Sequence, residues 1–107
     1  INFSQKNTSY DIITNVEKKT FPKGQSIEIL NSEIFDLSSN LLTNEQKEHV
    51  TKYFYLENDY KILNYELIKR YNKYNLCIDN YDDYLLLSKI IKKKGIFSTW
   101  KSYVKEL

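Results

Sequence analysis

The chain has 107 residues, of which 41% are hydrophobic, 28% charged and 15% aromatic, and its formal net charge is +2 at pH 7. This length allows at most one domain with a modest core, and the aromatic content argues against disorder. The lysines alternate with acidic residues instead of forming one basic block, which is not the charge pattern of a nucleic-acid-binding protein. We expect one globular domain without a nucleic-acid partner.

The cysteine content and the hydropathy of the sequence indicate the cellular compartment of the protein. Cys77 is the only cysteine, so an intrachain disulfide is impossible and a reducing compartment is the simpler expectation. No segment of the sequence is long and apolar enough to span a bilayer, and none resembles a signal peptide. These features predict a cytoplasmic protein with no membrane partner. The chain starts at Ile1 and contains no methionine, so we expect it to be processed or to be part of a longer protein.

Two short strands are predicted in the first third of the chain. Residues 10–16 are rich in β-branched side chains and lie between polar clusters, which favours a strand. Residues 21–24, with the sequence Phe-Pro-Lys-Gly, predict a shaped loop, because proline restricts the residue before it and Gly24 can adopt a positive φ. The second strand covers residues 26–30, where alternation places Glu28 on the face opposite its apolar neighbours.

Two helices are predicted next. Apolar residues at helical spacing indicate a short helix from about residue 31 to 42. Thr43 and Gln46 have the spacing of a capping box, so a second helix should begin there. We expect it to be continuous, with His49 in its second turn. Its core-facing side chains are then Val50, Tyr53 and Phe54.

The second half is predicted to alternate strands and helices. Residues 60–67 are expected to form a strand, residues 69–75 a loop, and residues 76–78 a brief buried strand that stops at Asp79. Asn80 then caps the clearest helix in the sequence, which runs to about Lys94.

Gly95 is expected to end that helix, and a last helix covers about residues 98–106. Strands that alternate with helices predict an α/β fold, in which helices cover at least one face of a sheet.

Four short motifs stand out along the chain: Phe21-Pro22-Lys23-Gly24, then Glu28, then Glu48-His49-Val50-Thr51 with Tyr53 and Tyr55, then Ile78-Asp79 followed by Asp83. In order and spacing they resemble the second half of the spore-coat polysaccharide biosynthesis type of cytidylyltransferase. That group is similar to the acylneuraminate and deoxy-octulosonate cytidylyltransferases. The resemblance covers about residues 10–92, and its specificity comes from four motifs in one order.

This resemblance implies both a fold and a reaction. The fold is a partial nucleotide-diphospho-sugar transferase fold, α/β with a mixed sheet and flanking helices. The reaction is the Mg²⁺-dependent transfer of a cytidylyl group from CTP to an acidic or modified sugar for surface polysaccharide synthesis. The family's nucleotide-binding loop and first metal-binding aspartate have no counterpart here. The resemblance therefore implies that residues 1–107 are the C-terminal portion of a longer nucleotidyltransferase and are inactive alone, and it is compatible with a homodimer.

Within the matching region, three positions depart from the family pattern. Ser26 stands where the family usually has an aspartate, and Lys52 stands where it has a proline. Lys47 replaces an arginine, which keeps the charge but loses the bidentate geometry of a guanidinium group.

Asp79 is the candidate metal ligand. The resemblance implies that its carboxylate binds Mg²⁺, which would neutralise charge while the acceptor oxygen attacks the α-phosphate and pyrophosphate leaves. From the residues alone, the alternative is a turn aspartate that bonds to the backbone ahead of a helix. A second carboxylate for the metal would have to come from outside this chain. Asp83 is interpreted as a first-turn carboxylate of the helix.

Lys23, Glu28, Glu48 and His49 are the candidate substrate-binding residues, and no catalytic residue is predicted. Glu48 and His49 would orient the acceptor sugar, although a lone histidine in a helix is more often structural. Glu28 would bond to acceptor hydroxyls or face solvent, and Lys23 would meet a phosphate or carboxylate or remain solvated. The rival hypothesis for the whole chain is a small non-catalytic α/β interaction or dimerisation module with a tyrosine-rich surface.

Overall fold

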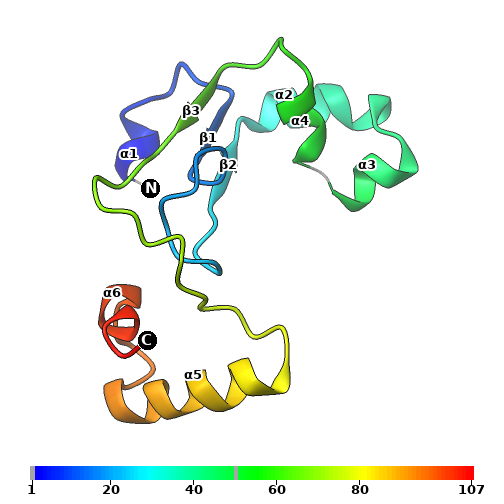
Figure 1. Cartoon of the computed structure of the whole chain (residues 1–107). Helices are drawn as coiled ribbons and strands as arrows, with labels where there is room; N and C mark the ends of the chain where they lie inside the picture. The colour runs from blue at the N-terminus through cyan, green and yellow to red at the C-terminus, as the bar shows by residue number, and fades with distance from the viewer. Residues whose placement is uncertain (1, 50) are drawn as a thin grey trace. The chain divides into compact units, whose positions relative to one another are not determined.

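The structure of the chain is a computed structural model, and it describes residues 2–49 and 51–107, apart from the side chains of residues 37–39. The chain folds as two compact units (Figure 1). Unit 1 consists of Ile1–Lys18 and Ile27–Glu66, and unit 2 consists of Lys19–Ser26 and Leu67–Leu107. Unit 1 contains the sheet, and unit 2 contains the long C-terminal helix.

Within the described part of unit 1, three short strands form one mixed sheet in the order β2-β1-β3. β1 pairs antiparallel with β2, where Ile13 lies opposite Ile29, and parallel with β3, where Ile13 lies opposite Leu63. The three strands predicted in this unit are confirmed and are shorter than expected: two lie near the middle of the predicted ranges 10–16 and 60–67, and one covers the last three residues of 26–30. The strands are β1 (Ile12–Thr14), β2 (Glu28–Leu30) and β3 (Ile62–Asn64).

The central strand supplies the core of unit 1. Ile12 is 1% exposed and Phe54 is fully buried. The buried polar groups next to them are paired with backbone, as burial requires. The hydroxyl of Thr14 donates to the carbonyl oxygen of Ile27 at 3.2 Å, and the amide of Ile27 donates to Oδ1 of Asn15 at 2.8 Å. These bonds hold the start of β2 against the end of β1.

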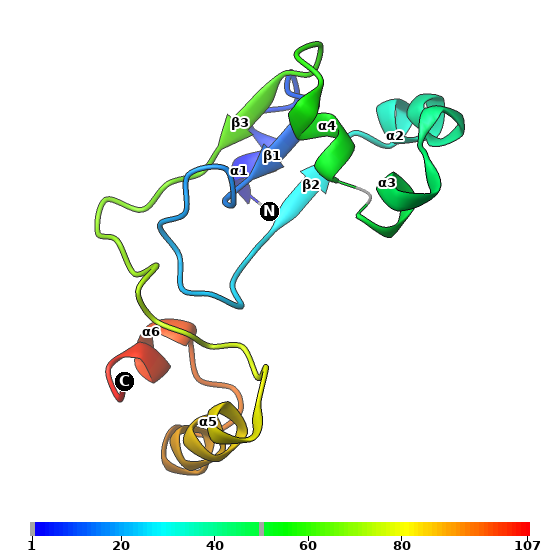
Figure 2. The same ribbon diagram turned by 45° about the vertical axis from the view of Figure 1, so that its right-hand side comes forward.

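Short helices flank the sheet of unit 1, and Figure 2 shows α4 beside β2 at one side of it. The predicted helix over residues 31–42 is confirmed as α2 followed by a 3₁₀ turn, η1. The predicted capping box is also confirmed, because the amide of Gln46 donates to the Thr43 hydroxyl at 3.2 Å and the Thr43 amide donates to Oε1 of Gln46 at 2.9 Å. The helices are α1 (Asn2–Gln5), α2 (Ser32–Ser38), η1 (Ser39–Leu41), α3 (Asn44–Glu48) and α4 (Lys52–Leu56).

The prediction of one continuous helix after Thr43 is wrong. α3 ends at Glu48, and His49 leaves the helical region with φ −121° and ψ 64°. The amide of Lys52 donates to the His49 carbonyl at 2.9 Å, which closes a tight turn between α3 and α4. Val50, which was expected to face the core, lies outside the described residues.

The position of α4 is set by aromatic packing. Phe54 is buried as predicted, and its ring lies edge-on to Tyr60, with 5.0 Å between the ring centroids. Tyr53 is half-buried, and its ring contacts Phe54 at 5.5 Å. The modest helix propensity of β-branched Thr51, just before α4, is compatible with a break at this point.

In unit 2 the two C-terminal helices are confirmed as α5 (Tyr81–Lys94) and α6 (Trp100–Val104). Leu87 and Ile90 are the buried side chains of α5, and Val104 is the buried side chain of α6. Gly95 ends α5 with a φ of +85°. Among the described residues of either unit, none of the helices combines the length and apolarity needed to cross a bilayer.

The predicted buried strand at residues 76–78 is wrong. These residues, all within the described part of the chain, form no strand, and Ile78 is 58% exposed. Pairing is limited to a single parallel bridge between Lys23 and Asn75. The amide of Lys23 donates to the Tyr74 carbonyl at 3.0 Å, and the amide of Leu76 donates to the Lys23 carbonyl at 2.9 Å. Because the loop at Lys23 is, among the described residues, the only backbone segment seen to pair with this one, and pairs at one residue, the segment does not form a β-ladder.

The loop predicted at residues 21–24 is confirmed. Gly24 has a φ of +93°, and a Cβ atom placed on it would lie 3.0 Å from the carbonyl carbon and oxygen of Leu76. Glycine is therefore required twice here, for the backbone angle and for the close approach. Phe21, at the start of the loop, packs against the ring of Trp100 with 5.8 Å between the centroids.

Candidate functional site

The five predicted site residues fall into two groups. Glu28, Glu48 and His49 belong to unit 1, whereas Lys23 and Asp79 belong to unit 2. Each group is brought together within its own unit by contacts that the sequence did not predict.

An open pocket in unit 1 forms where α3 gives way to α4. Its volume is about 610 Å³, and it is lined by Glu48, His49, Thr51, Lys52 and Tyr55. The break between the two helices creates this pocket, because the turn after Glu48 and the first turn of α4 supply its walls. Carboxylate, imidazole, hydroxyl and ammonium groups therefore surround one concave surface.

Tyr55 connects this pocket to Glu28. Its hydroxyl donates to Oε2 of Glu28 at 2.9 Å across the space between α4 and β2. Burial, reinforced by the Glu28 hydrogen bond and charge, raises the pKa of Tyr55 to about 12. The phenol therefore stays protonated at neutral pH and acts as a hydrogen-bond donor. Glu28 is half-buried, so of its two sequence-based interpretations, simple exposure to solvent is not what the structure shows.

Tyr55 lies in one of the four sequence motifs, but no role was predicted for it. A signal for it was present, because Tyr55 follows Thr51 by four residues and Lys52 by three. Those spacings place all three side chains on one side of a helical turn. The contact with Glu28 spans 27 residues and has no local signature.

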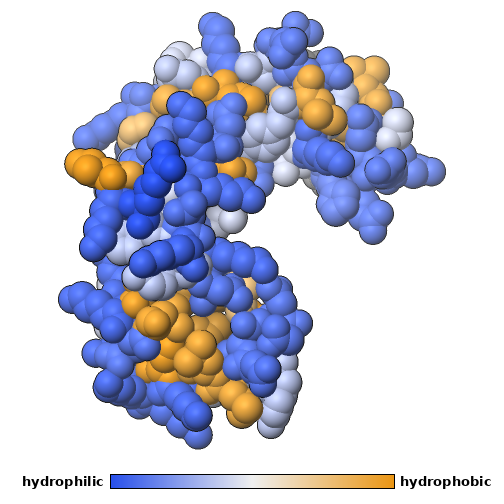
Figure 3. Space-filling model, viewed as in Figure 1, coloured by the Kyte–Doolittle hydropathy of each residue, from blue (hydrophilic) through white to orange (hydrophobic). Residues whose placement is uncertain are grey.

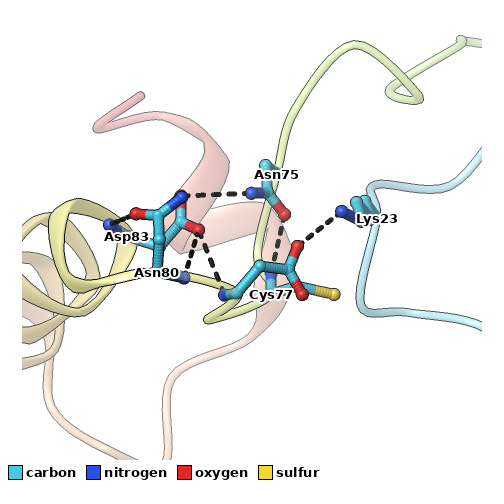
Figure 4. A network of polar contacts seen from close by, with 6 residues as sticks. Lys23, Asn75, Cys77, Asn80 and Asp83 are labelled. Atoms are coloured by element: carbon cyan, nitrogen blue, oxygen red, sulfur yellow. Dashed lines mark hydrogen bonds and ion pairs between the residues drawn. The ribbon is translucent and has the colours of Figure 1, made fainter.

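Lys23 and Asp79 form an ion pair in unit 2, with 2.5 Å between Nζ of Lys23 and Oδ2 of Asp79. This hydrogen bond and charge raise the pKa of Lys23 above its ordinary value of 10.5. Both side chains remain more than half exposed, at 61% and 54%. Figure 4 shows Lys23 at the edge of a larger polar network, which the Asp79 amide joins through its bond to Asp83.

The rest of that network is the N-terminal cap of α5. The amides of Asp79 and Asn80 both donate to Oδ2 of Asp83, at 3.1 and 3.2 Å. The Asp83 amide donates back to Oδ1 of Asn80 at 2.9 Å, and Nδ2 of Asn75 donates to Oδ1 of Asp83 at 3.3 Å. Asn75 also accepts the Cys77 amide at 2.9 Å. Asp83 is thus a first-turn capping carboxylate, as the sequence indicated.

Mg²⁺ is usually held by one or two carboxylates together with water and phosphate oxygens, but the carboxylate of Asp79 is already paired with the Lys23 ammonium. The described residues contain no group of three or more His, Cys, Asp or Glu side chains that would hold a metal ion. The carboxylate of Asp79 is bonded to Lys23, and that of Asp83 is bonded to the backbone. The assignment of Asp79 as a metal ligand stays a prediction.

The three-stranded mixed sheet with flanking helices confirms the predicted α/β fold class, and it matches a nucleotidyltransferase-like structure. That structure is a cytidylyltransferase from Leptospira borgpetersenii serovar Hardjo-bovis (strain JB197). The two chains are 25% identical, with a TM-score of 0.77, over 99% of this chain and 44% of the other. No family model matches the sequence, and no curated protein does.

The likeness supports the cytidylyltransferase family that the four motifs indicated. This chain spans less than half the length of the Leptospira protein, because the match covers 44% of that protein. The spore-coat type and the position of this chain within a longer enzyme stay predictions.

Proposed function

We propose that this chain supplies the acceptor-binding part of a cytidylyltransferase. In the whole enzyme a cytidylyl group would pass from CTP to an acidic or modified sugar used for surface polysaccharide synthesis, in the cytoplasm. The observation that carries the proposal is the likeness to the Leptospira cytidylyltransferase over 99% of this chain. Because that likeness extends over 44% of the Leptospira protein, the groups that bind CTP are proposed to lie outside these residues.

The pocket between α3 and α4 is the proposed site for the sugar. Glu48 and the carboxylate of Glu28 would accept hydrogen bonds from sugar hydroxyls, while Lys52 would pair with a carboxylate on an acidic sugar. His49 lines the same pocket and can donate or accept through its imidazole nitrogens. The Tyr55 hydroxyl would fix the rotamer of Glu28 and so orient the sugar for reaction, which is a positioning role.

Mg²⁺ belongs to this proposal only at the level of the whole enzyme. There it would neutralise charge on the triphosphate as pyrophosphate leaves. Lys23 would meet a phosphate or carboxylate oxygen at the loop that Gly24 shapes. None of these roles requires a catalytic residue in this chain.

Binding of the sugar tests the proposal directly. A panel of acidic and modified sugars should shift the NMR signals of Tyr55 and His49, and the variant Glu48→Gln should weaken that binding. The variant Glu45→Gln, which removes an exposed carboxylate from α3 outside the pocket, is the matched control. If the whole panel leaves the pocket signals unchanged, the acceptor site is wrong.

Turnover tests a separate part of the proposal. With CTP, Mg²⁺ and the same sugars, this chain alone should release pyrophosphate no faster than a blank reaction. Release well above the blank would show that the chain is active by itself.

A specific observation also supports the rival interaction module. Large apolar side chains of unit 2 are exposed, and Figure 3 shows hydrophobic surface in the part of the chain that carries α5 and α6. Tyr81 and Tyr84 stack on the surface of α5 at 5.9 Å. The exposed apolar side chains at and around α5 include Ile78, Tyr81, Tyr84, Leu85, Leu86, Ile96 and Phe97.

Self-association would be measured by sedimentation over a range of concentrations. If the module dimerises through this surface, the double variant Leu85→Ser/Phe97→Ser should shift the equilibrium to monomer. The variant Ile68→Ser removes an exposed apolar side chain from the loop between β3 and α5 and should leave it unchanged. A wild-type chain that stays monomeric at the highest concentration would contradict homodimerisation.

A further inference from the structure

The ammonium group of Lys23 is bonded to the Asp79 carboxylate, the group that the family resemblance assigns to a metal ion. Its Nζ atom is 2.5 Å from Oδ2 of Asp79, closer than most charge-assisted hydrogen bonds. Surface lysines often make ion pairs that contribute little to stability, so this distance alone would not mean much. Two further features of unit 2 distinguish this pair from an incidental contact.

The backbone of Lys23 is held on both sides. Its amide donates to the Tyr74 carbonyl, and its carbonyl accepts the Leu76 amide, at 3.0 and 2.9 Å. The next residue, Gly24, brings the loop so close to the Leu76 carbonyl that a Cβ atom would not fit comfortably. The point from which the Lys23 side chain leaves the backbone is therefore fixed relative to the segment that leads to Asp79.

The carboxylate of Asp83, which is bonded to the Asp79 amide, is hydrogen-bonded through both of its oxygens. Asp83 accepts two backbone amides on Oδ2 and the Asn75 side chain on Oδ1. To bind a cation through both oxygens, Asp83 would have to give up the Asn75 bond and the capping box that starts α5. Asp79 is therefore left with the Lys23 ammonium as its bonded cation.

We propose that Asp79 acts in this protein as the counter-ion that positions Lys23, and that the Lys23 ammonium replaces a divalent metal as the fixed cation of this site. An ammonium group has three N–H donors, and one of them is bonded to Asp79. The remaining donors are available to an anionic oxygen of a ligand. Unlike a metal ion, this positive charge cannot be removed by a chelator.

A metal titration of the full chain tests the inference without any transfer reaction, so it can fail independently of the proposed function. Mn²⁺ would be added while the broadening of backbone amide signals is followed by NMR. Wild-type chain should show no more broadening at Asp79 and Asn80 than at the exposed residue Asp82. Saturable broadening centred on Asp79 that the variant Asp79→Asn abolishes would overturn the inference.

The variant Lys23→Asp tests the same inference through a gain in Mn²⁺ affinity. It replaces the ammonium by a second carboxylate next to Asp79, and Mn²⁺ should then bind about tenfold more tightly than to wild type, or more. Lys19→Asp makes the same charge change at another exposed position of unit 2 and should give no gain. If Lys23→Asp gains no more than Lys19→Asp, Lys23 is not placed at a cation position and the inference is wrong.

The ammonium signal of Lys23 gives a readout that does not depend on any metal. Its N–H protons should exchange slowly in the wild-type chain because they are bonded to Asp79, and they should exchange rapidly in Asp79→Asn. Asp79→Glu, which restores the carboxylate, should recover part of the protection. Exchange of the Lys23 protons as fast as that of exposed Lys19 in the wild type would contradict the proposed positioning. Should Lys23→Asp fail to fold, this comparison and the Asp79→Asn titration still decide the question.

Discussion

Tyr55 is the residue on which unit 1 brings its candidate site together. It lies on α4, lines the pocket with Glu48 and His49, and holds the Glu28 carboxylate of β2 at 2.9 Å. Its hydroxyl thereby links Glu28, from one motif, to the pocket that Glu48 and His49 of another motif line. The strength of that connection can be measured from the ionisation of the phenol.

We expect Tyr55 to ionise only well above its ordinary value of 10, because burial raises its pKa to about 12. Glu28→Gln removes a negative charge and should lower this pKa, but not to the ordinary value of 10, because burial is the larger cause. The pKa would be followed by the NMR shift of the ring carbon that bears the hydroxyl, with Tyr55→Phe to assign the signal. Glu33→Gln, at an exposed position of α2, should leave it unchanged. An unshifted Tyr55 in Glu28→Gln would contradict the hydrogen bond.

Glu106 gives a second prediction at the scale of one residue. Hydrogen bonds from Lys93 and Lys94 lower its pKa to about 2 from the ordinary 4.5. A carboxylate with a lowered pKa stabilises the folded state fully above pH 4.5, and the contribution is lost as the pH falls toward 2. Fluorescence of Trp100, the only tryptophan, would report the denaturation midpoint of unit 2.

In that experiment Glu106→Gln should destabilise unit 2 at pH 7 and make little difference near pH 2. Glu45→Gln in α3 removes an exposed carboxylate that the structure places in unit 1, and it should not reproduce this pH dependence. An equal effect of Glu106→Gln at both pH values would show that the ion pairs of Glu106 with Lys93 and Lys94 do not stabilise unit 2.

At the scale of elements, the loop at Gly24 controls how the early and late parts of unit 2 meet. Gly24→Ala should destabilise unit 2 by about 1–3 kcal/mol, because it adds a strained φ and a clash with the Leu76 carbonyl. Gly95→Ala is the matched control, since Gly95 has a similar φ but nothing within 4 Å of the added carbon. Chemical denaturation gives the free energy of unfolding of both variants, and the difference between them is the contribution of the clash at Gly24. Equal destabilisation by the two would mean that the close approach contributes nothing.

Local signals predicted the elements whose determinants lie within a few residues of one another. Asn80, Asp83 and Gly95 specify the start and end of α5, and Thr43 with Gln46 specifies the start of α3. Each of these is a hydrogen bond or backbone angle confined to one turn.

Local sequence signals did not predict the elements whose formation depends on residues far away in the sequence. α4 is packed through the contact of Phe54 with Tyr60, and residues 76–78 form no strand because their neighbour is a loop that pairs at one residue. The same holds for the candidate site, whose residues were predicted but whose contacts were not. Lys23 and Asp79 are separated by 56 residues, a distance in sequence that no periodicity reports.

At the scale of the whole molecule, the two units share the chain in alternating stretches. Residues Lys19–Ser26 of unit 2 lie in sequence between β1 and β2 of unit 1. Thr20 holds this stretch in place, because its buried hydroxyl accepts the Leu67 amide at 3.0 Å and its carbonyl accepts the Tyr71 amide at 2.7 Å. The stretch is thus bonded to residues more than 40 positions away.

Thr20→Val keeps the shape of the side chain and leaves the Leu67 amide without its acceptor. We expect unit 2 to lose about 1–3 kcal/mol of stability, the usual cost of an unsatisfied buried group. Thr8→Val, at an exposed position in unit 1, is the control and should change little. Hydrogen exchange at the Leu67 amide should accelerate in Thr20→Val alone, and an unchanged rate would contradict the assigned bond.

This alternation has a consequence for how the chain folds as it is synthesised. Residues 19–26 emerge early, but their partners at residues 67–79 follow only after all of β2, α2, α3, α4 and β3. Closing so long a loop is entropically costly until unit 1 has formed and brought its ends together. Unit 1 should therefore fold first on the ribosome, and the Lys23 loop should wait unpaired until its partners, which begin at residue 67, have left the exit tunnel.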